Sequence, residues 1–90
     1  MKLRRYWFKF GNLAKFHPLS LGCGVTAFDY DDALRVLREN VFRCESLPPI
    51  EMFVEDIDIS TLDPGHVWPN IEVPIYRGVW FPKGYHEPIR

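Results

Sequence analysis

Residues 21–37 read LGCGVTAFDYDDALRVL, and in this stretch a glycine-punctuated apolar strand runs into an acidic helix start with almost no loop between them. Asp29 is a good N-cap residue, and Asp32 places a second carboxylate near the unpaired N–H groups and the positive dipole end of the helix. Apolar residues then recur at helical spacing along one stripe: Tyr30, Ala33, Leu34, Leu37 and Val41. We therefore predict a strand followed by a helix, from about residue 30 to residue 41, that lies on a sheet.

The strand that precedes the helix has glycines on one face. Alternation puts Gly22 and Gly24 on that face and Cys23 and Val25 on the other. Two glycines on one face indicate that a ring or another backbone approaches closely there. Cys23 lies in an apolar run, six residues before the helix cap, where nothing stabilises a thiolate. We interpret it as a small buried residue and not as a nucleophile.

Three further segments read as strands. Residues 4–10 alternate in polarity, as a half-buried strand does, and residues 74–82 are apolar on both faces, as in an inner strand or one covered twice. Residues 50–58 also alternate, but their apolar positions change face part of the way along. The two sets are Ile50, Met52 and Val54, then Ile57 and Ile59. This change of face predicts a bulge or bend near Glu55 and Asp56.

The order of these elements is β-β-α-β-β. It predicts an α+β domain with a mainly antiparallel sheet of about four strands and one helix packed on one face. Residues 1–90 form a single domain, because a chain of this length cannot support two separate cores. A turn-rich insert occupies residues 60–73, and a tail at 83–90 without any pattern is expected to fray. The sheet face without the helix must be partly exposed, covered by the insert, or buried in an oligomer.

Charge is spread unevenly along the chain. The net charge is −1, yet residues 1–20 carry five bases and no acid, and residues 21–63 carry ten acids and three bases. Two cysteines without CxxC spacing are too few for a disulfide scaffold. Lys9 and Lys15 interrupt any signal-peptide core, and no run approaches the ~18 apolar residues of a membrane span. We therefore expect a cytoplasmic protein without a membrane segment, and nothing in the sequence indicates a cofactor.

The densest set of potential metal ligands lies in residues 55–66. Its members are Glu55, Asp56, Asp58, Asp63 and His66. Carboxylates with one imidazole can hold a hard divalent ion, but this spacing matches no EF-hand loop or HExxH helix. Alternation also sends Glu55 to one face and Asp56 and Asp58 to the other. We expect a solvated acidic strand end without a metal and predict no catalytic residue. A small metal-dependent enzyme using these side chains is kept as the second alternative function.

Cations and aromatic rings are interleaved in the first strand. Its cations are Arg4, Arg5 and Lys9, and its rings include Tyr6, Trp7 and Phe8. Such a surface is suited to stacking bases, but the segment lacks an RNP-type signature and the domain as a whole is not basic. Cross-strand pairs of Arg5 and Lys9 with Glu51 and Glu55 would also absorb the positive charge. Nucleic-acid binding through Arg4, Arg5 and Lys9 is therefore the first alternative function.

The insert has an apolar tip, HVWPN, at residues 66–70. Tryptophan is the residue most enriched in binding hot spots, and loops frequently carry function. A flap folded over the uncovered sheet face explains the same residues equally well. Our leading hypothesis is a non-catalytic protein-interaction module, or a homodimer, because small aromatic-rich domains with one covering helix tend to leave an apolar patch. Its predicted partner-binding residues are Trp68, His66, Trp7 and Trp80.

Three segments together resemble a group of small uncharacterised bacterial proteins. They are GCGVTAFDYDDAL at residues 22–34, VEDIDISTLDPGHVWPNI at 54–71 and YRGVWFP at 76–82. The resemblance spans nearly the whole chain and implies a single compact bacterial domain. No activity is assigned to that group, so the resemblance transfers no catalytic residue to this chain.

Overall fold

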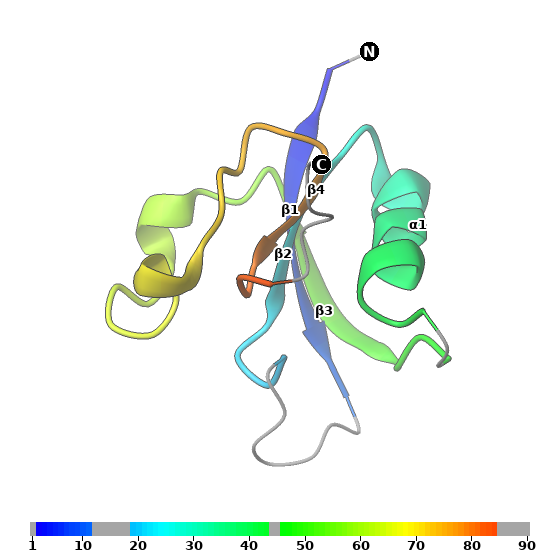
Figure 1. The fold of residues 1–90 in the computed structure, drawn as a ribbon, viewed down its shortest axis with the longest axis horizontal. Coiled ribbons are helices and arrows are strands. Elements are labelled where there is room, and N and C mark those ends of the chain that lie inside the picture. Colours follow the sequence, from blue (N-terminus) through cyan, green and yellow to red (C-terminus); the bar gives the residue numbers. More distant parts are fainter. Residues whose placement is uncertain (1, 12–18, 44–45, 85–90) are drawn as a thin grey trace.

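The computed structural model describes residues 2–11, 19–43 and 46–84 of the chain. Its elements are β1 (Arg4–Phe10), β2 (Cys23–Ala27), α1 (Tyr30–Asn40), β3 (Ile50–Glu55), two short 3₁₀ helices (Ile59–Thr61 and Trp68–Asn70) and β4 (Gly78–Phe81). The strands form one open sheet in the order β3-β1-β2-β4, and each neighbouring pair is antiparallel (Figure 1). The predicted α+β class and the β-β-α-β-β order are confirmed.

The helix α1 begins where the sequence predicts. The Asp29 side chain accepts a hydrogen bond from the Asp32 N–H (2.8 Å), and the Asp32 carboxylate accepts one from the Phe28 N–H (3.0 Å). These two bonds satisfy N–H groups at the start of the helix, where no helical partner exists. The buried side chains of α1 include the aliphatic Val36, which the predicted stripe omitted, whereas Tyr30 and Leu34 are only partly buried.

The molecule has three layers. Figure 1 shows α1 on one side of the sheet and the segment with the two 3₁₀ helices on the other. The core between the sheet and α1 is built from Tyr6, Phe8, Phe10, Leu19, Cys23, Val25, Ala27, Ala33, Val36, Leu37, Phe42 and Val79. The core under the insert is built from Trp7, Ile57, Val67, Trp80 and Phe81. The insert therefore covers the sheet face that the single helix leaves bare.

Gly24 in β2 and Gly22 just before this strand leave room for two indole rings. A Cβ atom on Gly24 would lie 2.5 Å from the Trp80 ring, and one on Gly22 would lie 2.5 Å from the Trp7 ring. Gly22 also has a φ of +129°, which favours glycine. The predicted close approach of rings to the glycine face is confirmed.

Strand β3 contains a bulge. Lys9 pairs with Met52 while Phe10 pairs with Ile50, so Glu51 is an extra residue on β3. The bulge turns Ile50 toward the core beneath α1, whereas Val54, further along, packs against the Trp7 core. The prediction that the first three apolar residues of β3 share one face is therefore wrong for Ile50.

The predicted bend near residue 56 is present as the end of the strand. Asp56 has a φ of +58°, and the chain leaves the sheet there. The N–H of Ile57 still donates to the Arg5 carbonyl (3.1 Å), which anchors the start of the insert to β1. The last strand is shorter than predicted, because residues 74–77 form turns before β4 begins at Gly78. In the described part of the chain, no helix is long and apolar enough to cross a membrane.

Candidate functional site

The helix covers the sheet unequally. It packs mainly against β2 and β4 and makes few contacts with β1 and β3. Two rings contact Phe8 of β1: Tyr30 from the start of α1, at 6.0 Å between ring centroids, and the cross-strand neighbour Phe53 from β3, at 6.2 Å. Tyr30 and Phe53 are 4.6 Å apart. This aromatic group joins the end strand of the sheet to the helix and is half open to solvent at Phe53.

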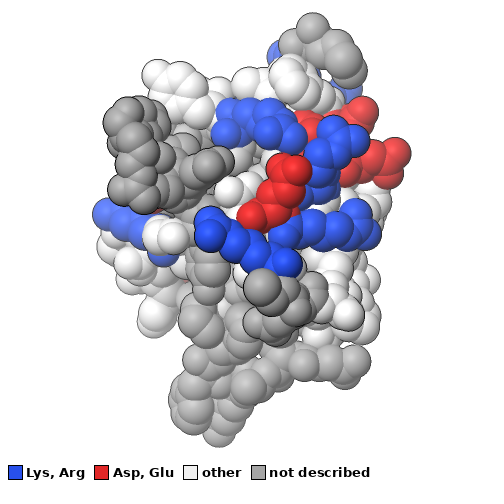
Figure 2. All heavy atoms as spheres, turned by 45° about the vertical axis from the view of Figure 1, so that its right-hand side comes forward, with Lys and Arg blue, Asp and Glu red and all other residues white. Residues whose placement is uncertain are grey.

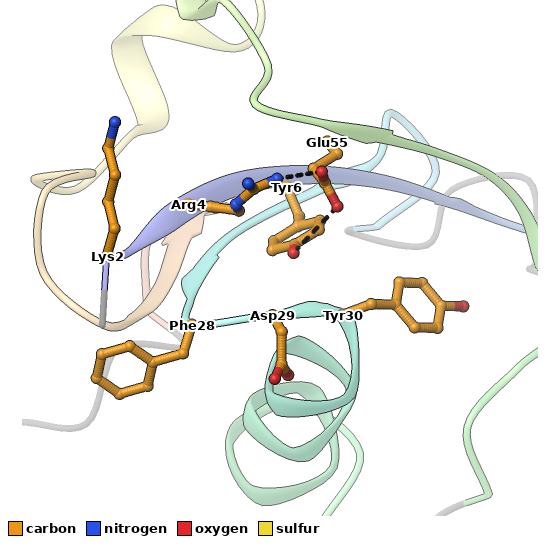
Figure 3. A pocket seen from close by; sticks show the side chains of 7 residues that line it. All are labelled: Lys2, Arg4, Tyr6, Phe28, Asp29, Tyr30 and Glu55. Carbon is orange, nitrogen blue, oxygen red and sulfur yellow. Dashed lines mark hydrogen bonds and ion pairs between the residues drawn. The ribbon is translucent and has the colours of Figure 1, made fainter.

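A cleft adjoins the aromatic group (Figure 3). It has a volume of about 550 Å³ and is lined by Lys2, Arg4, Tyr6, Phe28, Asp29, Tyr30 and Glu55. The buried Tyr6 ring points into it, and the Tyr6 hydroxyl donates weakly to Glu55 (3.4 Å). Burial, followed by the negative charge of Glu55, raises the pKa of Tyr6, so this hydroxyl stays protonated at neutral pH.

The charged groups of the cleft pair across the β1 and β3 strands. The Arg4 guanidinium binds the Glu55 carboxylate and lies 3.4 Å from Asp56. One cation therefore faces two carboxylates at this end of β3. Figure 3 shows Lys2 at the other end of the cleft from Glu55.

Strand β3 is the end strand of the sheet beside this cleft. Among the described residues, no strand pairs with its outer edge and no backbone hydrogen bond reaches residues 51–55 from outside the sheet. Two large apolar side chains in its middle, Met52 and Phe53, are each 46% exposed. They lie on opposite faces, because Met52 pairs with Lys9 and Phe53 pairs with Phe8. We define the edge site as strand β3, Tyr30 and the cleft.

The tip of the insert, residues 66–70, has one buried side chain and two exposed ones that the sequence predicts as binding residues or as part of a flap. Val67 is buried and closes the second core, as a flap does. Its neighbour Trp68 is 44% exposed, and the indole N–H of Trp68 donates to the Ile59 carbonyl (3.0 Å). His66 is exposed, with its ring 3.0 Å from the Asp63 carboxylate. Trp68 and His66 are thus at the surface of the insert.

The placement of Trp7 and Trp80 corrects the sequence prediction. They are 4% and 1% exposed, and their ring centroids lie 5.9 Å apart in the core under the insert. The glycine face of β2 makes room for them, and Val67 and Ile57 cover them. Neither indole is at the surface where a partner would reach it, so they are core residues.

The basic residues of β1 are dispersed. Arg4 is paired on the helix side, whereas Arg5 and Lys9 alternate onto the other face and form no ion pair with a described residue. The predicted pairs of Arg5 and Lys9 with Glu51 and Glu55 are therefore wrong, since Arg4 takes Glu55. The neighbouring rings of Tyr6, Trp7 and Phe8 are buried. The stacking platform that a base-binding sheet needs is not formed by these rings.

The acidic residues of the insert cap turns. Asp58 accepts hydrogen bonds from the Ser60 N–H (3.0 Å) and hydroxyl (2.7 Å), and these bonds lower its pKa. Asp63 accepts from the Gly65 N–H (2.8 Å), which, together with the His66 ring, lowers its pKa. Within the described residues, no three side chains of His, Cys, Asp or Glu come together as metal ligands. Cys23 is fully buried, and burial raises the pKa of its thiol.

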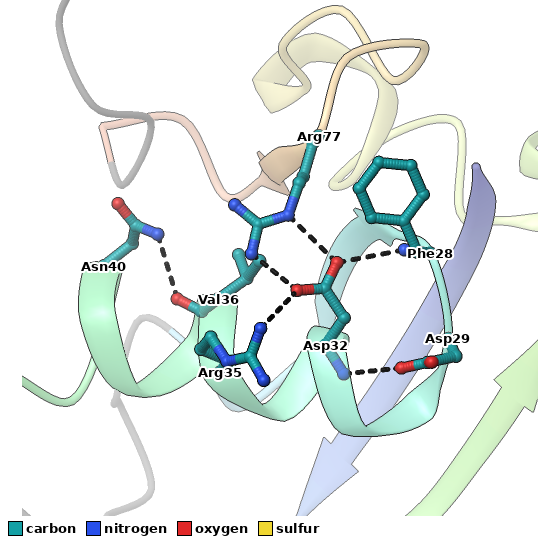
Figure 4. Close-up of polar contacts among 7 residues, drawn as sticks. All are labelled: Phe28, Asp29, Asp32, Arg35, Val36, Asn40 and Arg77. Carbon is teal, nitrogen blue, oxygen red and sulfur yellow. Dashed lines mark hydrogen bonds and ion pairs between the residues drawn. The ribbon is translucent and has the colours of Figure 1, made fainter. Parts of the chain in front are cut away.

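A tight ion pair holds the turn before β4 to the helix (Figure 4). The Arg77 guanidinium donates two hydrogen bonds to the Asp32 carboxylate, at 2.9 and 2.6 Å, and Arg35 lies 3.5 Å away. The hydrogen bond from Arg77, opposed by burial, is the largest cause of the Asp32 pKa of about 2. Figure 2 shows cations and carboxylates interleaved on the side where α1 comes forward, as on a solvated helix face.

The edge site includes residues that the sequence hypotheses missed: Met52, Phe53 and Tyr30. A signal for Met52 and Phe53 was present, because IEMFVE at residues 50–55 places large apolar side chains on both faces of a strand next to a proline-rich loop. Comparison with family models, curated proteins and solved structures finds no match for this chain.

Proposed function

We propose that this protein is a non-catalytic protein-interaction module that binds an extended segment of a partner along β3. The observation that carries the proposal is an end strand whose middle residues, Met52 and Phe53, are half exposed while no described element pairs with its outer edge. An unpaired strand edge presents a row of N–H and C=O groups that another strand can pair with. Strand addition to a sheet edge is a common mode of peptide recognition.

The side chains around the edge favour specific pairing over random association. Soluble proteins protect sheet edges with charges, prolines and bulges. In β3 these devices lie at its ends: the bulge at Glu51 and the charge at Glu55 flank an apolar middle. This arrangement leaves about the length of one short strand for a partner, with charges that limit the register.

The aromatic group supplies a rigid anchor. Phe53 packs on Tyr30 and lies beside Phe8, so its ring is held in place before any partner arrives. Rigid aromatic side chains contribute strongly to binding because little side-chain entropy is lost when they are covered. The partner's side chains on the helix side of the sheet would pack against this ring, and those on the other side against Met52.

The proposal is tested by selecting extended peptides from a displayed random library on the intact protein. The selected peptides are expected to bind the wild type and to lose affinity for a Phe53→Ala variant. N-methylation of alternate residues of the peptide should abolish binding, because it removes the N–H groups that pair with β3. Peptides that bind the Phe53→Ala variant as tightly as the wild type, and that still bind after N-methylation, would contradict strand addition. A library that yields no binder would contradict it as well.

A further inference from the structure

We infer that the segment accepted by β3 is basic, with lysine or arginine side chains on the helix side of the added strand. This inference rests on the proposed strand addition and specifies its partner. Strand β3 carries Glu51 and Glu55, and Asp56 follows directly. Arg4 faces both Glu55 and Asp56, whereas Glu51 forms no ion pair with another residue that the structure describes. Residues 51–56 therefore carry three carboxylates against the guanidinium of Arg4, and the cleft adds one cation, Lys2, and one carboxylate, Asp29.

The helix side of the edge offers a place for a cation. The Glu55 carboxylate is about half exposed and lies on the same face as Phe53, two residues away. Tyr30 extends this face with a second ring, 4.6 Å from Phe53. A lysine or arginine on an added strand would have its alkyl chain against these rings and its charged end at the carboxylate. A neutral side chain there would give the Glu55 carboxylate no cation besides Arg4, and an acidic one would repel it.

A second copy of the chain fits this edge poorly. Opposite residues of an antiparallel pair point to the same face, so two β3 strands related by a twofold axis pair about one shared residue. Pairing about Phe53 sets Glu51 of each copy opposite Glu55 of the other, and like charges directly opposite one another destabilise a strand pair. Pairing about Val54 sets Phe53 opposite Glu55. The carboxylates of β3 thus disfavour self-pairing and favour a strand of opposite charge.

The test uses two synthetic peptides of about nine residues, long enough to span one strand. In one, lysine alternates with valine; in the other, glutamate replaces every lysine. We expect the lysine peptide to bind about tenfold more tightly than the glutamate peptide at low salt, with the difference shrinking as salt is added. Glu51→Lys should weaken binding of the lysine peptide about threefold, and the matched Glu39→Lys variant on α1 should leave it unchanged.

The outcomes separate this inference from the proposed function. Equal binding of both peptides, with protection of the β3 amides from hydrogen exchange, would overturn the basic partner and leave strand addition standing. Binding of neither peptide by a monomeric protein would contradict both. A protein that dimerises without peptide, and whose β3 amides become protected on dimerisation, would make a second copy the occupant and overturn the inference.

Discussion

The ring of Phe53 on the end strand lies 4.6 Å from the ring of Tyr30 at the start of α1. This contact joins β3 to α1, the one α-helix of the described residues, although the two residues are far apart in the sequence. It also fixes the most exposed large ring of β3 beside the Arg4, Tyr6 and Glu55 cleft. The edge site is therefore a consequence of how α1 sits to one side of the sheet.

The first prediction concerns the two exposed rings on opposite sides of the sheet. Phe53→Ala should weaken the binding of a peptide selected on this protein by about 2 kcal/mol or more, as expected for a hot-spot aromatic residue. Trp68→Ala should leave the affinity unchanged, because Trp68 belongs to the insert, where its indole N–H donates to the Ile59 carbonyl, and not to the edge site. Isothermal titration of both variants measures this. Loss of affinity in Trp68→Ala but not in Phe53→Ala would instead place the binding site at the tip of the insert.

The second prediction concerns pH. The pKa of Asp32 is about 2 in the folded protein, below its ordinary value of 3.8, because Arg77 holds the ionised form. The ion pair therefore stabilises the fold fully above about pH 5, and this stabilisation of about 2 kcal/mol is lost as the pH falls toward 2. Urea unfolding across this range should show the loss in the wild type.

The control for this prediction is a pair of neutralising variants. Asp32→Asn should flatten the pH dependence of the free energy of unfolding between pH 5 and pH 2 by removing the titrating group. Asp31→Asn, at the exposed neighbouring position, should leave most of it in place. An Asp32→Asn protein with the wild-type pH dependence would show that this ion pair does not stabilise the fold.

The third prediction concerns the glycine face of β2. Gly24→Ala should destabilise the protein by about 1–3 kcal/mol, because its methyl group would lie 2.5 Å from the Trp80 ring in a packed core. Gly65→Ala is the matched control: its nearest contact is 3.4 Å away, at the exposed Asp63 side chain. Equal denaturation midpoints for the two variants would contradict the packing of Trp80 over β2.

Local sequence patterns predicted the architecture well. The Asp29 cap, the glycine face and the order of elements all depend on neighbours along the chain, and the structure confirms them. The exposure of individual rings was harder to predict. Trp7 and Trp80 are buried because an insert distant in sequence folds over them, and a pattern of alternation does not show which face a loop will cover.

The edge site was missed for a similar reason. The position of β3 at the end of the sheet follows from the strand order, and the bulge at Glu51 depends on its register with β1. Neither feature is encoded in the local pattern of residues 50–58. The same register explains why Arg4, and not Arg5, is the residue that reaches Glu55.

Amide hydrogen exchange with a peptide selected from the displayed library tests strand addition most directly. A spectrum recorded with and without the peptide reports on each backbone N–H of the sheet. We predict that N–H groups on the outer edge of β3 become protected when the peptide binds, while those of β4, the other end strand, keep their exchange rates. Protection confined to β4 or to the insert, with β3 unchanged, would contradict the proposed strand addition.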